Sequence, residues 1–337
     1  MIQPTAERMM HKRISLTAVV LAFIASGCDE SSPDSVSHAI DLPLHEQRVV
    51  SFQREPNVAY FDDVVFVDDK MLVVESTTAS VSAFNVSDGR RAWTVGRKGA
   101  GPGEYLEPRF FVARPDATVG VIDVRQGRIT VLNPSDGSVK EVVSGERVTG
   151  DLNNVCGRID GSFLAIKMPQ FDVVRIDERP ESTPLFRIQW PVETYNQSPM
   201  LQQGLFARSR DGRCVVFQPR GDFFYEVDGD SLPRNKFHRY AIAYPPQQID
   251  RSQRTPRAIP GGGAAQYAAL KGDTLFVLRG GPSKNDLGKV DLYLLASGAR
   301  IGTLLLPSET YIFDVKGSSI VTLVNTDEGS VLTLYQR

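Results

Sequence analysis

Histidine and cysteine carry much of the chemistry that proteins perform, and both are scarce in this sequence. The chain has 4 histidines and 3 cysteines among 337 residues. His11 and His38 lie near the N-terminus, which leaves only His45 and His238 for a folded domain. A metal site built from several imidazoles, or a nucleophile activated by histidine, needs more than these two residues. We therefore expect neither kind of site.

Polar residues recur at one position that could form a binding site. Each of six short apolar runs is followed by a polar residue, with a slip of one residue in the last run. If the runs are equivalent strands around an axis, these side chains ring one end of it as the mouth of a ligand site. The alternative is that strands become polar where they leave the core, with Asp123 paired to Arg128 across a turn. The six candidates are Glu75, Asp123, Lys167, Gln218, Arg279 and Asn325.

Carboxylates are plentiful, so calcium is the metal that the composition allows best. The sequence has 40 Asp and Glu residues, and calcium takes oxygen ligands. However, no run of the form D-x-D-x-D-G is present. We therefore expect no cofactor and no metal site, with calcium as the single alternative.

The segment Gly96–Tyr105 reads GRKGAGPGEY and could be mistaken for a phosphate-binding loop. A P-loop needs Gly-Lys-Ser/Thr followed by a helix, and this segment has neither. We expect a tight crossover in which glycines adopt positive φ, with Arg97 and Lys98 in solvent. Glu104 is expected to accept hydrogen bonds from loop amides or to pair with a nearby arginine.

The six apolar runs show what elements must position these residues. Their starts are separated by about 48, 44, 51, 61 and 45 residues, close to the period of propeller blades. A polar turn precedes each run, and an alternating strand follows it, as expected for antiparallel hairpins. The runs are Met71–Val74, Val119–Ile122, Phe163–Ile166, Cys214–Phe217, Leu275–Leu278 and Ile320–Leu323.

Further strands complete each unit and close the ring. Val64–Val67 precedes the first run, and Val81–Phe84 and Arg91–Val95 follow it, which gives four strands per unit. The last unit ends after three strands, while Gln47–Phe52 is a strand without a partner in sequence. We predict an all-β, six-bladed β-propeller over residues 44–337, with four antiparallel strands per blade, in which the N-terminal strand completes the last blade. The alternative is a β-sandwich or two β-domains.

The glycine-rich loop also carries a resemblance to a known family. Together with Pro108, it resembles the G-x-G-x-GPGEF…P loop of the NHL-like and TolB-like six-bladed propeller lipoproteins of bacteria. The blade pattern extends this resemblance over most of the chain. The motif occurs once, so the resemblance implies a fold rather than an activity.

The N-terminus indicates export and a lipid anchor. Basic residues precede the apolar run Ile14–Ile24, which is long enough for a signal peptide and too short to span a bilayer. Small residues leading to Cys28 resemble a bacterial lipobox, although Ala25 stands where Leu is usual. We predict a signal peptide over residues 1–27, lipidation of Cys28 and a flexible tether over 28–43. The alternative is a secretory signal with an incidental cysteine.

Cys156 and Cys214 are the remaining thiols. They could pair in an oxidising compartment, but two cysteines form no framework pattern. Their separation of about 58 residues places them in different repeats, so we expect them to stay unpaired.

The charge argues against nucleic acid as a partner, and the missing His/Cys constellation, the closed ring and the polar mouth favour a binding role. The net charge is -2, without the basic excess of nucleic-acid-binding proteins. We expect a monomeric, membrane-anchored lipoprotein of the bacterial cell envelope that faces the periplasm and binds an envelope protein, a peptide or a glycan without chemistry. The alternative is a metal-assisted hydrolase, lactonase or lyase that uses axial carboxylates.

Overall fold

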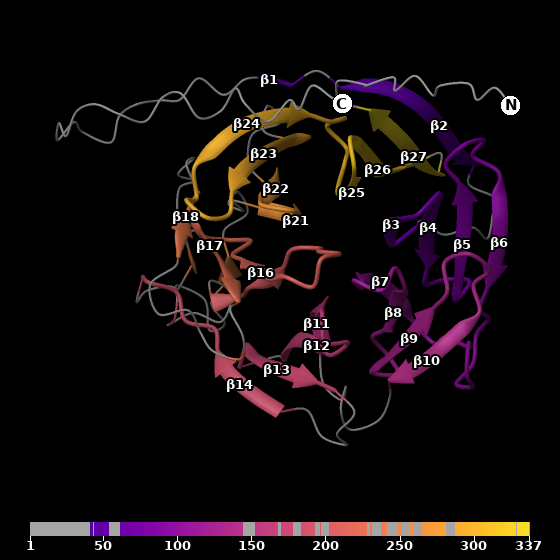
Figure 1. The fold of residues 1–337 in the computed structure, drawn as a ribbon, viewed down its shortest axis with the longest axis horizontal. Coiled ribbons are helices and arrows are strands. Elements are labelled where there is room, and N and C mark those ends of the chain that lie inside the picture. Colours follow the sequence, from indigo (N-terminus) through magenta and orange to yellow (C-terminus); the bar gives the residue numbers. More distant parts are fainter. Residues whose placement is uncertain are drawn as a thin grey trace, which may run out of the picture. The chain divides into compact units, whose positions relative to one another are not determined.

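Short antiparallel strands make up the described part of the chain, and they are grouped as blades around a central axis (Figure 1). The structure is a computed structural model. It describes residues 41–42, 44–53, 61–143, 152–167, 170–177, 183–192, 196, 202–227, 230, 237–240, 249–250, 257–258, 265–280, 287–327 and 329–336. All of them belong to the unit His38–Arg337. The predicted signal peptide, Cys28 and most of the predicted tether lie outside the described residues. Within these ranges, no helix has the length and apolarity that crossing a membrane requires.

The first three blades each consist of four consecutive strands that pair in chain order. Blade 1 contains β3 (Asp63–Val67), β4 (Lys70–Glu75), β5 (Ser80–Asn85) and β6 (Arg91–Val95). Blade 2 contains β7 (Pro108–Ala113), β8 (Val119–Asp123), β9 (Arg128–Leu132) and β10 (Val139–Val143). Blade 3 contains β11 (Leu152–Gly157), β12 (Phe163–Lys167), β13 (Asp172–Ile176) and β14 (Thr183–Arg187).

Blades 4 and 5 follow the same order, with a small hairpin between them. Blade 4 contains β15 (Leu205–Phe206), β16 (Cys214–Phe217), β17 (Phe223–Val227) and β18 (His238–Arg239). The hairpin pairs β19 (Ile249–Asp250) with β20 (Arg257–Ala258). Blade 5 contains β21 (Ala265–Lys271), β22 (Thr274–Arg279), β23 (Lys289–Leu294) and β24 (Arg300–Leu305).

Blade 6 is assembled from both ends of the chain. It contains β25 (Ile312–Lys316), β26 (Ser319–Thr326) and β27 (Gly329–Gln336), and β2 (His45–Gln53) is its outer strand. In the register of β2 with β27, Val50 lies opposite Leu332 and Arg48 opposite Leu334. This pairing covers the edge of β27 that would otherwise be open. The predicted six-bladed propeller, with four strands per blade and closure by the N-terminal strand, is confirmed.

The propeller begins slightly earlier than the sequence indicated. Strand β1 (Asp41–Leu42) pairs in parallel with β24, with Asp41 opposite Thr303 and Leu42 opposite Leu304. The last residues of the predicted tether are therefore held as a fifth strand on blade 5. The apolar pattern could not reveal this, because two residues paired through their backbone leave no periodicity.

The alternation of side chains along the second strand of each blade builds the core. In β4, Leu72 and Val74 pack into a cluster shared with blade 2, whereas Met71 and Val73 pack into a cluster shared with blade 6. Successive residues of a strand face opposite sides of the sheet, so a strand between two neighbours must be apolar at every position. This explains the unbroken apolar runs in the sequence.

The glycine-rich loop connects blades 1 and 2, as predicted. Gly96 has a φ of 94°, and a Cβ there would lie 2.7 Å from the ring of the buried Tyr105. The carboxylate of Glu104 accepts a hydrogen bond from the Gly101 amide at 2.9 Å and one from Arg97 at 2.8 Å. Both expected partners of Glu104 are thus present, and they hold the crossover together.

The expectation that Cys156 and Cys214 stay unpaired is wrong. The two residues form a disulfide with a Cα–Cα distance of 5.9 Å. Cys156 lies on β11 of blade 3 and Cys214 on β16 of blade 4, and both side chains belong to the cluster between these blades. Residues in different repeats become neighbours when the repeats are consecutive blades, so the separation of 58 residues did not argue against pairing.

Candidate functional site

The innermost strand of each blade lies next to the axis of the ring, and we call the space around this axis the channel (Figure 1). A cavity lies at the end where these strands begin. We call this the cavity end, and we call the opposite end, where the innermost strands turn into the second strands, the turn end. The cavity has a volume of about 330 Å³. Every blade contributes to its lining, which places it on the axis of the ring. The lining residues are Asp63, Phe110, Phe111, Ile122, Asn154, Val155, Gln203, Leu205, Phe206, Arg208, Gln266, Tyr267, Tyr311 and Ile312.

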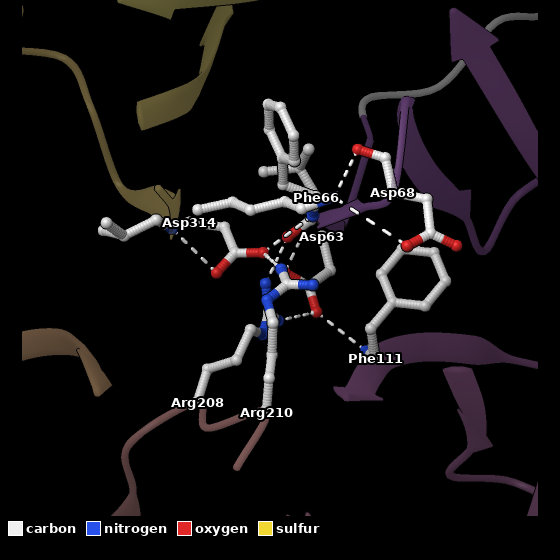
Figure 2. A network of polar contacts seen from close by, with 10 residues as sticks. Asp63, Phe66, Asp68, Phe111, Arg208, Arg210 and Asp314 are labelled. Carbon is white, nitrogen blue, oxygen red and sulfur yellow. Dashed lines mark hydrogen bonds and ion pairs between the residues drawn. The ribbon is translucent and has the colours of Figure 1, made fainter. Parts of the chain in front are cut away.

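An ion pair that crosses the ring contributes to the lining of this cavity. Arg208 follows β15 of blade 4, and its guanidinium donates to the carboxylate of Asp63 on β3 of blade 1 and to the carbonyl of Val64 (Figure 2). The Asp63 and Arg208 side chains are 1% and 7% exposed. Blades 1 and 4 are opposite one another in a ring of six, so this contact spans the channel.

A second ion pair lies beside the first. Arg210 donates to the carboxylate of Asp314 on β25 of blade 6, and Figure 2 shows both arginines pointing from the same segment of blade 4 toward the two aspartates. The Asp314 carboxylate also accepts a hydrogen bond from the Phe66 amide at 2.7 Å. Asp63 accepts one from the Phe111 amide, again at 2.7 Å. The aspartates thereby join blade 6 to blade 1 and blade 1 to blade 2.

Burial and charge oppose each other in this network. Burial raises the pKa of the Asp63 carboxyl, and the guanidinium of Arg208 opposes part of that rise. Burial alone would lower the pKa of Arg208, but the charges of Asp63 and Asp314 more than compensate, so the net shift is upward. Burial raises the pKa of Tyr267, whose ring lies 5.4 Å from the Arg208 guanidinium. Because each arginine faces an aspartate, the network as a whole is close to neutral.

Aromatic side chains form much of the cavity wall, and one of them is held by a residue that the sequence singled out. The hydroxyl of Tyr311 donates to the carbonyl of Phe61 at 2.5 Å, and the Asn325 amide donates to the Tyr311 hydroxyl at 2.6 Å. Asn325 also accepts a hydrogen bond from Ser330. This group of contacts fixes Tyr311 at the seam between blades 6 and 1.

The six sequence-predicted residues do lie at one end of the ring, and it is the cavity end. They stand at the ends of the second strands, however, one strand away from the channel, and in the described ranges none of them lines the axial cavity. Asp123 is buried and accepts hydrogen bonds from the amides of Leu106, Glu107 and Gln126. The ion pair of Asp123 with Arg128 that was the alternative is not formed; Arg128 donates to loop carbonyls instead.

The other predicted residues also have local contacts. Glu75 accepts a hydrogen bond from Thr78, Gln218 accepts one from the Asp222 amide, and Arg279 forms a buried ion pair with Asp291. Lys167 ends β12 opposite Leu152. The contacts of these residues are local to their own blades, and their role in ligand binding stays a prediction.

The sequence contained a signal for the true lining residues. Asp63 directly precedes the apolar stretch of β3, and Arg208 and Arg210 interrupt the approach to the second strand of blade 4. Asp63 lies on the innermost strand of blade 1, and Arg208 and Arg210 follow the innermost strand of blade 4, so these charged side chains reach the axis. The candidate residues were chosen at the ends of the second strands, because the apolar runs of these strands are the stronger sequence pattern. The first strands, however, are the innermost ones.

Carboxylates near the axis are engaged within the protein. Asp63 and Asp314 each accept from an arginine and from backbone amides. Among the described residues, no group of three or more His, Cys, Asp or Glu side chains is arranged to hold a metal ion.

Comparisons with known proteins agree with this architecture. A protein family described as a 6-bladed beta-propeller matches residues 53–142. A Bacteroides fragilis protein assigned as exported is 14% identical with a TM-score of 0.54, and the match covers 89% of this chain and 97% of that one. Virginiamycin B lyase from Staphylococcus aureus is 11% identical with a TM-score of 0.53, covering 88% and 100%.

A third similar structure is the Swd1 β-propeller domain of Myceliophteria thermophila, which is 9% identical with a TM-score of 0.51 and coverage of 88% and 100%. No curated protein matches the sequence. At these identities the structural likeness concerns the fold alone. The chain is a six-bladed β-propeller whose candidate binding site is the axial cavity.

Proposed function

We propose that the protein is a lipid-anchored propeller of the bacterial cell envelope that faces the periplasm and binds a ligand in the axial cavity without transforming it. The observation that carries this proposal is the cavity itself, which all six blades line and to which the Asp63–Arg208 ion pair contributes. A concave site with apolar walls and a few fixed polar groups is the usual form of a ligand site.

The lining favours an uncharged ligand with an apolar part. The charge of Arg208 is balanced by Asp63, so this ion pair in the cavity lining offers little net attraction to a charged ligand. Phe110, Leu205 and Tyr311 supply apolar surface, and the amides of Asn154, Gln203 and Gln266 supply neutral hydrogen-bonding groups. A segment of an envelope protein or a peptide fits this combination, with an apolar side chain in the cavity and backbone groups at the amides. A glycan is the other outcome that the experiment below distinguishes.

Two observations support the proposed location. The sequence before residue 44 has the order of a lipoprotein signal, Cys28 and a polar segment. The disulfide between Cys156 and Cys214 is of the kind that persists in oxidising compartments such as the periplasm.

Site-directed photo-crosslinking in cells tests the binding site and identifies the ligand class. We would replace Phe110, in the cavity wall, by p-benzoylphenylalanine, and use Ile159 as the control position. Ile159 is 81% exposed and lies in the turn that follows the innermost strand of blade 3, at the turn end. We expect an adduct from position 110 and none from position 159, with mass spectrometry assigning it as protein, peptide or glycan. Adducts from position 159 alone would refute the proposed site.

A further inference from the structure

Cations gather at the turn end of the channel, on the far side of the ion pairs from the axial cavity. Arg210 follows the innermost strand of blade 4, Lys271 ends β21 of blade 5, and Lys316 ends β25 of blade 6. All three line one cavity of about 250 Å³. The three blades are consecutive, so three positive side chains approach one space from three directions.

This cavity belongs to the mouth of the channel. A neighbouring cavity of about 120 Å³ shares Arg210 and Lys316 with it and is also lined by Asp68 of blade 1 and Arg114 of blade 2. Residues of blades 1, 2, 4 and 6 meet only near the axis of the ring. The turn end therefore has an axial opening of its own, and the ion pairs of Arg208 and Arg210 lie between it and the cavity end.

Two carboxylates near these cations already have partners, and one of them, Asp314, pairs with the cation Arg210 itself. Asp314 is buried and accepts from Arg210 and from the amides of Phe66 and Val315. Asp211 is the one carboxylate among the described residues that line the 250 Å³ cavity; it accepts hydrogen bonds from the Ser209 hydroxyl and the Arg213 amide and so caps its own turn.

The environment of Lys316 favours an added anion. Its amino group donates to the carbonyl of Asp68 and lies 3.9 Å from the carboxylate of the same residue. Burial lowers the pKa of Lys316, and the charge of Arg210 lowers it further, while Asp68, Asp69 and Asp314 oppose the shift. The charged form of this lysine is therefore under-stabilised, and a second anion beside it would relieve the repulsion from Arg210.

The space next to the cations is open. Gly272 and Gly317 line the same cavity, and a Cβ built on either residue would meet no atom within 4 Å. Both glycines have positive φ, as their tight turns require, so the turns place no side chain in the cavity.

We propose that the cavity formed by Arg210, Lys271 and Lys316 binds a phosphate group. A phosphate offers three strong acceptor oxygens, which matches three cationic donors arriving from separate blades, and lysine and arginine are its usual partners. This site is distinct from the axial cavity and does not depend on the ligand proposed there.

Calorimetric titration of the full chain with inorganic phosphate tests the proposal. We expect saturable binding that weakens about tenfold or more in Lys316→Gln and again in Lys271→Gln, because each loses a charge-assisted hydrogen bond. Arg158→Gln is the matched control. Arg158 occupies the corresponding turn of blade 3, is paired with Asp230 and lines neither cavity, so its removal should leave the affinity within about twofold.

A vesicle experiment distinguishes the two sources of phosphate. Wild type and the Lys271→Gln/Lys316→Gln variant would be compared on phosphatidylcholine vesicles with increasing phosphatidylglycerol. Any anchor is the same in both proteins. If vesicle binding rises more steeply with phosphatidylglycerol content for wild type than for the variant, the phosphate belongs to a lipid headgroup. If the two rise equally, the phosphate belongs to a soluble compound. Absence of inorganic phosphate binding, or binding that survives both substitutions, would overturn the proposal.

Discussion

The guanidinium of Arg208 in blade 4 and the carboxylate of Asp63 in blade 1 meet across the channel of the propeller. These residues are 145 positions apart in the sequence. Their contact joins opposite sides of the ring, and the Arg210–Asp314 pair beside it joins blade 4 to blade 6. It also lies between the axial cavity at the cavity end and the cationic mouth at the turn end.

A double-mutant cycle should show strong coupling between these two residues. Asp63→Asn leaves a buried guanidinium without its counter-charge, and Arg208→Gln leaves a buried carboxylate, so each should lower the free energy of unfolding by about 3–5 kcal/mol. The double variant should lose much less than the sum, as measured by urea denaturation. The control is Arg97→Gln, which breaks an ion pair with Glu104 whose arginine side chain is 81% exposed and should cost less than about 1 kcal/mol. Additive losses would show that the pair does not hold the ring together.

The disulfide between blades 3 and 4 should make stability depend on redox conditions. Removing a cross-link that closes a loop of 58 residues should cost about 4 kcal/mol, chiefly because the unfolded chain gains freedom. We expect Cys156→Ala/Cys214→Ala to unfold at lower urea than oxidised wild type, and dithiothreitol to bring wild type close to the variant. If the reductant leaves the urea midpoint of the wild type unchanged even after cycles of unfolding and refolding in its presence, the disulfide is not formed.

Two glycine substitutions separate steric clash from backbone strain. Gly96 has a φ of 94° and its Cβ would collide with the Tyr105 ring and the Ala79 carbonyl, whereas Gly272 has a φ of 51° and open space around it. Gly272→Ala should therefore cost about 1–2 kcal/mol for the left-handed conformation alone. Gly96→Ala should cost clearly more, as read from thermal or urea unfolding. Equal losses would mean that Tyr105 does not pack tightly against the loop.

His238 should make the protein less stable as the solution becomes mildly acidic. Burial lowers the pKa of His238, and a hydrogen bond with the backbone of Leu295 opposes only part of that shift. The unfolded chain therefore takes up the proton at higher pH than the folded protein. The contribution of His238 to the free energy of unfolding is complete above the unperturbed histidine pKa of 6.5. This contribution decreases as the pH falls through that value.

His238→Gln removes this titration. Between about pH 7.5 and about pH 5.5, the urea midpoint should fall more for wild type than for His238→Gln. The usual pKa values of carboxyl groups lie below this interval, so histidine dominates the titration there. A variant that loses as much stability as wild type over the same interval would show that His238 does not carry the dependence.

The blades could be predicted from the sequence because a strand packed between two neighbouring sheets must be apolar throughout. Met71–Val74 and the runs like it are therefore visible without a structure, and so are the turns before them. The unpaired strand around Val50 and the three-stranded last unit together predicted how the ring closes. Hydrophobic burial leaves a periodic record in the sequence, and that record was sufficient for the fold.

The binding site was less visible, because single polar residues have no period. Glu75 and Asp123 stood out by position, yet both serve local turns. Arg208 and Asp63 are brought together by ring geometry across 145 positions, which no spacing rule predicts. The disulfide was missed for a related reason, since sequence distance does not show that consecutive blades lie side by side.

Crosslinking at the rim of the axial cavity tests whether this cavity takes up the ligand. Gln266 lies at the exposed rim of the cavity, so p-benzoylphenylalanine at that position should capture the ligand in cells. Leu205→Trp would then fill the cavity from its wall, with the unfolding temperature as a check on the fold. We predict that the adduct yield at position 266 falls severalfold when tryptophan occupies position 205. An undiminished yield in a folded Leu205→Trp variant would contradict binding in the axial cavity.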